Sequence, residues 1–178
     1  ISGHAVGAET PRAESLIVHY DTTVGRIGDA AGLGLHRTVK GQWMDNSGNG
    51  NHGLIYGIDG GTYSSVDRAF SLPGVNLNYV KVSDPTGFPT GDAIYSMSAW
   101  IWMNGTQPST LAQIITFGSS WASVQLATMY IHSSNKLGAD IGSNDVKTTN
   151  AVLSDKTWHH VAIVKKGTGQ ISTSMFDM

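Results

Sequence analysis

The most regular pattern of apolar and polar positions lies between Tyr95 and Met103, which reads YSMSAWIWM. Successive residues of a strand face opposite sides of a sheet, so the serines and tryptophans share one face and the residues between them share the other. The first face holds Ser96, Ser98, Trp100 and Trp102. The segment runs into Asn104-Gly105, a dipeptide typical of two-residue hairpins.

Other short segments rich in β-branched and aromatic residues follow at similar spacing, separated by clusters of glycine, serine, asparagine and aspartate. They predict strands at Leu16–Tyr20, Gly53–Tyr56, Ala69–Leu72, Tyr79–Val82, Gln113–Phe117, Val124–Ile131, Lys136–Ile141, Lys147–Val152, His159–Lys166 and Gln170–Phe176. No segment shows a convincing helical period, and no internal repeat is found. Short strands at this spacing predict an all-β sandwich or barrel.

Composition supports this fold class and excludes several functions. The chain has 178 residues, of which 22 are glycine. Only 13% of its residues are charged, against a usual value of about 25%. A net charge of −2 provides no basic field for nucleic acid, and no apolar run approaches the roughly 18 residues of a membrane span. Cysteine is absent, which excludes disulfides and thiolate chemistry. We expect residues 1–15 to be a loose lead-in and residues 16–178 to form one domain.

The stretch from Gly41 to Gly53, GQWMDNSGNGNHG, predicts a tight loop rich in oxygen atoms. Its glycines tolerate positive φ, and its Asp and Asn side chains can bond to their own backbone. Calcium takes about six to eight oxygen ligands, and Asp45, Asn49 and Asn51 are the candidate ligands. The alternative is a turn whose polar groups are paired by Asx hydrogen bonds within the loop, because calcium sites usually contain more than one carboxylate.

Aromatic residues are the candidates for ligand binding. Tryptophan offers a flat apolar plate with one N–H group, which suits sugar rings and protein anchors. Trp100 and Trp102 are the first candidates, and Trp121 and Tyr130 are expected to add to the same surface. The alternative is that Trp100 and Trp102 pack in the core or beneath a loop.

The sequence argues against an enzyme. Most glycoside hydrolases use two carboxylic acids, but the two glutamates, Glu9 and Glu14, both precede the first predicted strand. No predicted strand carries acids at i and i+2. His159 and His160 are neighbours in a strand and therefore point to opposite faces, so they cannot chelate one ion. No zinc spacing, nucleophile elbow or phosphate loop is present.

Five stretches in order resemble one family: SLIVHYD, WMDNSGNGNHGLIYG, GVNLNYVKV, YSMSAWIWM and TWHHVAIVKKG. Together they are similar to the laminin-G-like branch of the concanavalin A-like lectin/glucanase superfamily, from about Ser15 to the C-terminus. The resemblance implies a jelly-roll sandwich of two antiparallel sheets that binds carbohydrate or protein. It also implies a structural calcium ion, as in many relatives, and a place in a secreted, cell-surface or virion-associated protein.

Two departures from that family matter. The segment Thr22–Lys40 is longer than the usual link, and relatives continue with further strands beyond the position of Asp177. We therefore expect a sandwich without its C-terminal strands, in which the edge Gln170–Phe176 pairs with a protein partner or with a second copy. The resulting hypothesis is a non-catalytic module that binds carbohydrate or glycoprotein. The alternative is a structural protein that assembles a particle or surface layer.

Overall fold

The computed structural model describes residues 16–21, 26–27, 39–56, 62–64, 69–71, 79–103, 105, 111–118, 126–132, 135–141, 144–153, 155–167 and 171–177. All regular structure in these ranges is β-strand, and every strand pair is antiparallel, which confirms the predicted all-β class. The described part of the chain therefore includes no helix of a length and apolarity that would span a membrane. The chain divides into two compact units, residues 1–88 and 89–178, and each is described by itself. The single domain expected over residues 16–178 stays a prediction, and the lead-in 1–15 lies outside the described residues.

The first unit contains a four-stranded sheet in the order β1-β2-β3-β6 and a separate pair, β4-β5. These strands are β1 (Arg26–Ile27), β2 (Val39–Trp43), β3 (Gly53–Tyr56), β4 (Thr62–Ser64), β5 (Ala69–Ser71) and β6 (Tyr79–Lys81). Strands β2 and β3 flank the glycine- and asparagine-rich loop and pair with each other, so the loop is the connection of a hairpin.

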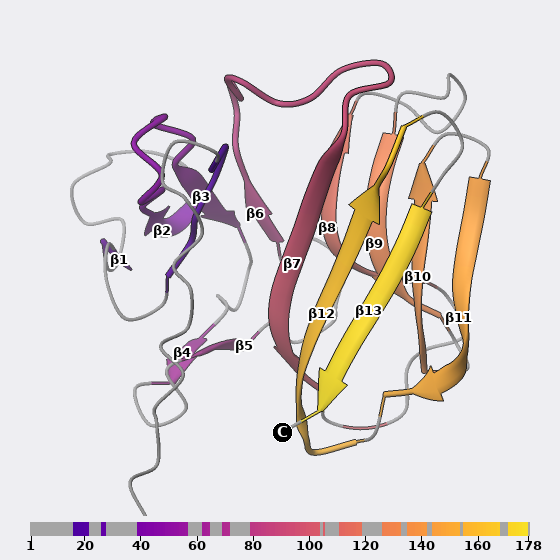
Figure 1. Ribbon diagram of the computed structural model, residues 1–178. Helices are drawn as coiled ribbons and strands as arrows, with labels where there is room; N and C mark the ends of the chain where they lie inside the picture. Colours follow the sequence, from indigo (N-terminus) through magenta and orange to yellow (C-terminus); the bar gives the residue numbers. More distant parts are fainter. Residues whose placement is uncertain are drawn as a thin grey trace, which may run out of the picture. The chain divides into compact units, whose positions relative to one another are not determined.

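The second unit contains two sheets, one of three strands in the order β13-β12-β7 and one of four in the order β11-β10-β9-β8 (Figure 1). The three-stranded sheet consists of β7 (Tyr95–Trp102), β12 (Trp158–Lys165) and β13 (Ile171–Asp177). The other consists of β8 (Ala112–Gly118), β9 (Leu126–Ile131), β10 (Lys136–Ile141) and β11 (Asn144–Val152). Figure 1 shows the three-stranded sheet in front of the four-stranded one.

The core of the second unit joins the two sheets. Alternate residues of β7 and β12 turn inward and belong to the same cluster as residues of β9 and β10. The buried members are Met97, Met103, Ala127, Met129, Ile131, Leu137, Ala139, Leu153, Val161 and Ile163. Burial of these side chains is the main favourable term in folding, and it gives the second unit a sandwich-like character.

Two local predictions are wrong. Leu16–Tyr20 is not a strand, because only Tyr20 forms an isolated bridge, to Asp45, and the segment is otherwise bonded by side chains. Asn104-Gly105 does not close a two-residue hairpin. Strand β7 pairs with β12, whereas β8 begins at Ala112 and pairs with β9 in the other sheet. The chain therefore crosses between sheets after β7, and local turn chemistry gives no signal of that crossing.

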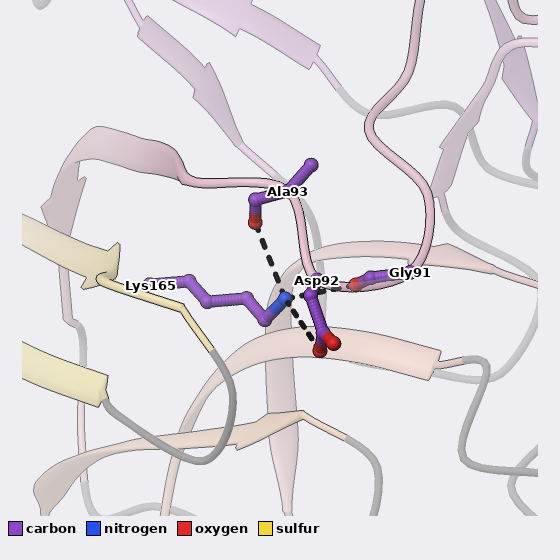
Figure 2. Close-up of polar contacts among 4 residues, drawn as sticks. All are labelled: Gly91, Asp92, Ala93 and Lys165. Carbon is purple, nitrogen blue, oxygen red and sulfur yellow. Dashed lines mark hydrogen bonds and ion pairs between the residues drawn. The ribbon is translucent and has the colours of Figure 1, made fainter.

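Lys165, at the end of β12, is the buried cation of the second unit's described core, with 4% of its surface exposed. Its ammonium donates to the carbonyl oxygens of Gly91 (2.8 Å) and Ala93 (3.2 Å), as Figure 2 shows. The exposed carboxylate of Asp92 lies 3.9 Å away, and the ring of Tyr95 lies 5.8 Å from the same nitrogen. Burial raises the pKa of Tyr95 to about 12. A buried ammonium must be bonded to be tolerated, so Lys165 ties the turn before β7 to β12.

Replacement of Lys165 by Met should lower the free energy of unfolding by about 1–3 kcal/mol, because two carbonyl groups lose their charged donor while the apolar stem is kept. Urea denaturation measures the effect. Lys166→Met is the control, since Lys166 is the exposed neighbour on the same chain segment. Equal, small losses in the two variants would contradict the assigned role of Lys165.

Candidate functional site

The outer face of the three-stranded sheet carries a row of aromatic side chains, which we call the aromatic platform: Trp100, Trp102, Trp158 and His160. Trp100 and Trp102 alternate with core residues along β7 and are 51% and 48% exposed. Residues i and i+2 of a strand are about 7 Å apart, so the two indoles stand side by side along β7. Both tryptophans are therefore surface residues, and their predicted alternative as core residues is wrong.

The other two rings of the platform come from β12 and meet the first two by register. Trp158 lies directly opposite Trp102, and His160 directly opposite Trp100. The ring centroids of Trp102 and Trp158 are 5.6 Å apart in an edge-to-face arrangement at 61°. Those of Trp100 and His160 are 5.0 Å apart at 49°. Such cross-strand aromatic pairs stabilise a sheet by about 0.5–1.5 kcal/mol each, so the partly buried β12 rings hold the exposed β7 rings in place.

The end of the platform is fixed by bonds between two loops. The amide of Lys156 donates to the carbonyl of Met103 (2.9 Å), and the amide of Gly105 donates to the carboxylate of Asp155 (2.6 Å). These bonds connect the exit of β7 to the entry of β12. Trp102 and Trp158 thereby lie beside this bonded connection, while about half of the surface of Trp100 and of Trp102 remains exposed.

Two of the predicted ligand-binding aromatics do not extend this platform. Tyr130 lies in β9 of the other sheet and is 1% exposed, with its ring over Gly138 of β10. A side chain at Gly138 would collide with that ring, since its Cβ would lie 2.4 Å from a ring carbon. The prediction that Tyr130 adds to the exposed surface is therefore wrong, because Tyr130 fills the space above a glycine. Trp121 lies outside the described residues.

Trp158 and His160 were missed as partners of Trp100 and Trp102. The signal was present, because Trp-x-His in one strand and Trp-x-Trp in another share the same period of two. The sequence does not show that β7 pairs with β12, because more than fifty residues separate the two strands. His159, on the other face of β12, is fully buried, which agrees with the expected separation of the two histidines.

The predicted calcium loop is organised around the carboxylate of Asp45, which is 6% exposed. Its Oδ1 accepts hydrogen bonds from the amides of His19 (2.8 Å) and Ser47 (2.9 Å). Its Oδ2 accepts from the Ser47 hydroxyl (2.7 Å) and the Asn51 amide (2.9 Å). Burial alone would raise the pKa of Asp45, but these bonds outweigh it and lower the pKa below its ordinary value. The negative charge is thus held by the loop itself and by the segment 16–21.

The two asparagines of the loop also bond within the protein. Asn51 is buried, and its amide group donates to the carbonyls of Ile17 (2.8 Å) and Thr86 (3.0 Å), while its Oδ1 accepts from the Thr86 amide (2.8 Å). The Asn49 side chain donates to the carbonyl of Leu16 (2.7 Å). Both side chains therefore bind the segment 16–21, and Asn51 also binds the chain at Thr86.

These contacts do not fit a calcium ion. An ionised carboxylate has about four acceptor positions, and four donors already occupy those of Asp45. The Oδ1 of Asn51 accepts a backbone amide, so its oxygen faces a donor and not an open site. Within the described residues no three His, Asp or Glu side chains are grouped as metal ligands. The arrangement favours the alternative reading, a turn that satisfies its own hydrogen bonds.

Tyr20 closes the other side of this loop. Its hydroxyl donates to the carbonyl of Asn51 (2.5 Å), and its ring stacks on Trp43 with centroids 5.1 Å apart. Burial and the nearby charge of Asp45 raise the pKa of Tyr20 to about 12, so the hydroxyl keeps its proton as a donor. Gly53 is required beside it, because a Cβ there would lie 2.4 Å from the Val80 side chain. The aromatic anchor and the glycine both serve the packing of the loop.

In comparisons with known proteins, the chain matches no family model, no curated protein and no solved structure.

Asp45→Asn should lower the protection of the Ser47 and Asn51 amides against hydrogen exchange by about 2 kcal/mol. An amide side chain places an N–H group against at least one of the four donors and removes the charge that strengthens the others. Asp84→Asn is the matched control, because Asp84 is an exposed acid of the same unit. Unchanged protection in Asp45→Asn would contradict the role of the Asp45 carboxylate as the acceptor that organises the loop.

The same carboxylate should make the stability of the loop depend on pH. Because the pKa of Asp45 is lower in the folded state, its contribution is fully present above the unfolded value, about 3.9, and is lost as the pH falls through the folded value. Amide protection at Ser47 and Asn51 should fall in that acidic range in the wild-type protein and stay flat in Asp45→Asn. An equally steep acid loss in the variant would assign the effect to other groups.

Calcium should not change the unfolding midpoint of the wild-type protein relative to EDTA, because binding at Asp45 would first have to displace several of the loop's own donors. Thermal unfolding in excess calcium and in EDTA measures this. The opposite result would be a midpoint that rises with calcium concentration in the wild-type protein, as mass action requires, and does not change with calcium in Asp45→Asn. It would show that the loop opens to hold an ion.

Proposed function

We propose that this protein is a non-catalytic module that binds carbohydrate, or the glycan of a glycoprotein, on the aromatic platform. The observation that carries the proposal is the pair of half-exposed indoles, Trp100 and Trp102, presented side by side on one face of β7. The C–H faces of a sugar ring pack against such plates, and this contact needs no movement of the rigid sheet.

Polar groups beside the platform complete a site of this kind. Ser98 is exposed on the same face of β7, two residues before Trp100, and Ser96 is exposed two residues before Ser98. Their hydroxyl groups can both donate and accept, as sugar hydroxyls require. Binding sites are mainly apolar with a few placed polar groups, and the platform with its two serines has this composition.

The resemblance to laminin-G-like domains of the concanavalin A-like superfamily gives the proposal its fold context. The two antiparallel sheets of the second unit and their shared core agree with such a sandwich. The jelly-roll connection and the secreted, cell-surface or virion location of that family are proposals that follow from the resemblance alone. The calcium ion that the resemblance also implies is not proposed at Asp45, because the loop's own donors occupy that carboxylate.

A second candidate function, assembly through protein contacts, is favoured by the edge of the three-stranded sheet. Among the described strands, β13 pairs only with β12, over all seven of its residues. A strand with one unpaired side offers a row of backbone donors and acceptors to another chain. Trp100 and Trp102 lie in β7, at the other end of the strand order. They would be anchors in a protein interface where a partner covers the outer face of the sheet.

Trp100→Ala and Trp102→Ala should each weaken glycan binding by roughly three- to tenfold, the value of one aromatic contact. A glycan array identifies a ligand, and tryptophan fluorescence titration then measures the affinity. Ile94→Ala is the matched control, because Ile94 is an exposed apolar residue next to the opposite end of β7.

Light scattering of the wild-type protein and the three variants separates assembly from glycan binding. Concentration-dependent association that disappears in both tryptophan variants, without any glycan signal for the wild-type protein, would favour the second function over the first.

A further inference from the structure

We infer that the ligand of the aromatic platform is a neutral, extended glycan whose chain runs along β7, so that consecutive sugar units stack on Trp100 and Trp102. This inference rests on the proposed function and adds the charge of the ligand and the direction in which it lies. Three features of the sheet carry it: the residue types of the outer face, the orientation of the rings, and the charges at its end.

The outer face of β7 and β12 carries no formally charged residue type. It holds Ser96, Ser98, Trp100, Trp102, Trp158, His160, Ala162 and Val164. An acidic glycan needs lysine or arginine to offset the loss of its hydration, and none of these positions supplies one.

The two charged residues of the turn before Trp158 also give no net attraction for an anion. Asp155 and Lys156 lie next to each other in the turn before Trp158, and both are exposed. One is an acid and the other a base, so their fields oppose each other within a Debye length. The carboxylate of Asp155 is also bonded to the amide of Gly105.

The orientation of the rings selects a direction along the strand. Across the strands, Trp158 meets Trp102 edge-to-face at 61°, so these two rings cannot both lie flat against one ligand. Trp158 and His160 are also only partly exposed, whereas Trp100 and Trp102 present about half of their surface. The two accessible plates follow each other along β7 at about 7 Å, so a ligand that contacts both must extend along the strand.

The test uses linear oligosaccharides of neutral sugars, the gluco-, xylo- and manno-series, each from monosaccharide to hexasaccharide. Oligogalacturonides and heparin fragments of matched length are the acidic probes. Affinity for a neutral series should rise by roughly three- to tenfold when the chain becomes long enough to cover the second ring. The gain should vanish in Trp100→Ala and in Trp102→Ala and persist in Ile94→Ala. Because no charge is involved, added salt should change the affinity less than about twofold.

Several results would overturn the inference. Acidic oligosaccharides that bind through Trp100 and Trp102, and bind more weakly in salt, would show an anionic ligand and leave the proposed carbohydrate function in place. A monosaccharide that binds as tightly as the hexasaccharide would exclude the extended arrangement along β7. If no carbohydrate of either kind binds the wild-type protein, both the inference and the proposed function fail. Self-association lost in the tryptophan variants would assign the platform to a second copy of the chain.

Discussion

The antiparallel ladder between β7 and β12 is the constraint on which the second unit depends. It pairs eight residues of β7 with eight of β12 without a shift, from Trp158 opposite Trp102 to Lys165 opposite Tyr95. Because side chains alternate, one register decides both faces at once. It places Val161 and Ile163 in the core and brings the rings of Trp158 and His160 against those of Trp102 and Trp100. A slip of one residue would bury the tryptophans and expose the core.

The loop of the first unit is held by hydrogen bonds that pair its buried polar groups. Four donors converge on the Asp45 carboxylate, and the Asn51 side chain makes three hydrogen bonds, one to Ile17 and two to Thr86. Each donor is a backbone or hydroxyl group that would otherwise be costly to bury. The loop thus uses its polar side chains for its own structure. Oxygen-rich composition is shared by calcium loops and by such turns, and only the direction of the donors distinguishes them.

Stability and binding draw on separate parts of the second unit. The core between the two sheets and the bonds of Lys165 to Gly91 and Ala93 stabilise the fold from the inner face of β12. The aromatic platform lies on the outer face of the same strand. Substitutions at Trp100 and Trp102 therefore leave the core intact and each remove one cross-strand ring pair, a loss of about 0.5–1.5 kcal/mol that an unfolding measurement separates from the loss of binding.

The sequence by itself determined the all-β class, the face that carries Trp100 and Trp102, and most strand positions, because these depend on a local period of two. The structure alone decided which strands pair, since pairing of β7 with β12 joins segments far apart in the chain and depends on burial of a common core. For that reason the sequence predicted a hairpin at Asn104-Gly105, placed Tyr130 on the surface and missed Trp158 and His160 as members of the platform. It also named Asp45, Asn49 and Asn51 as candidate calcium ligands, but residue types do not show where hydrogen bonds go. Some of their donors, such as His19 and Thr86, lie about 25 to 35 residues away and are brought there only by folding.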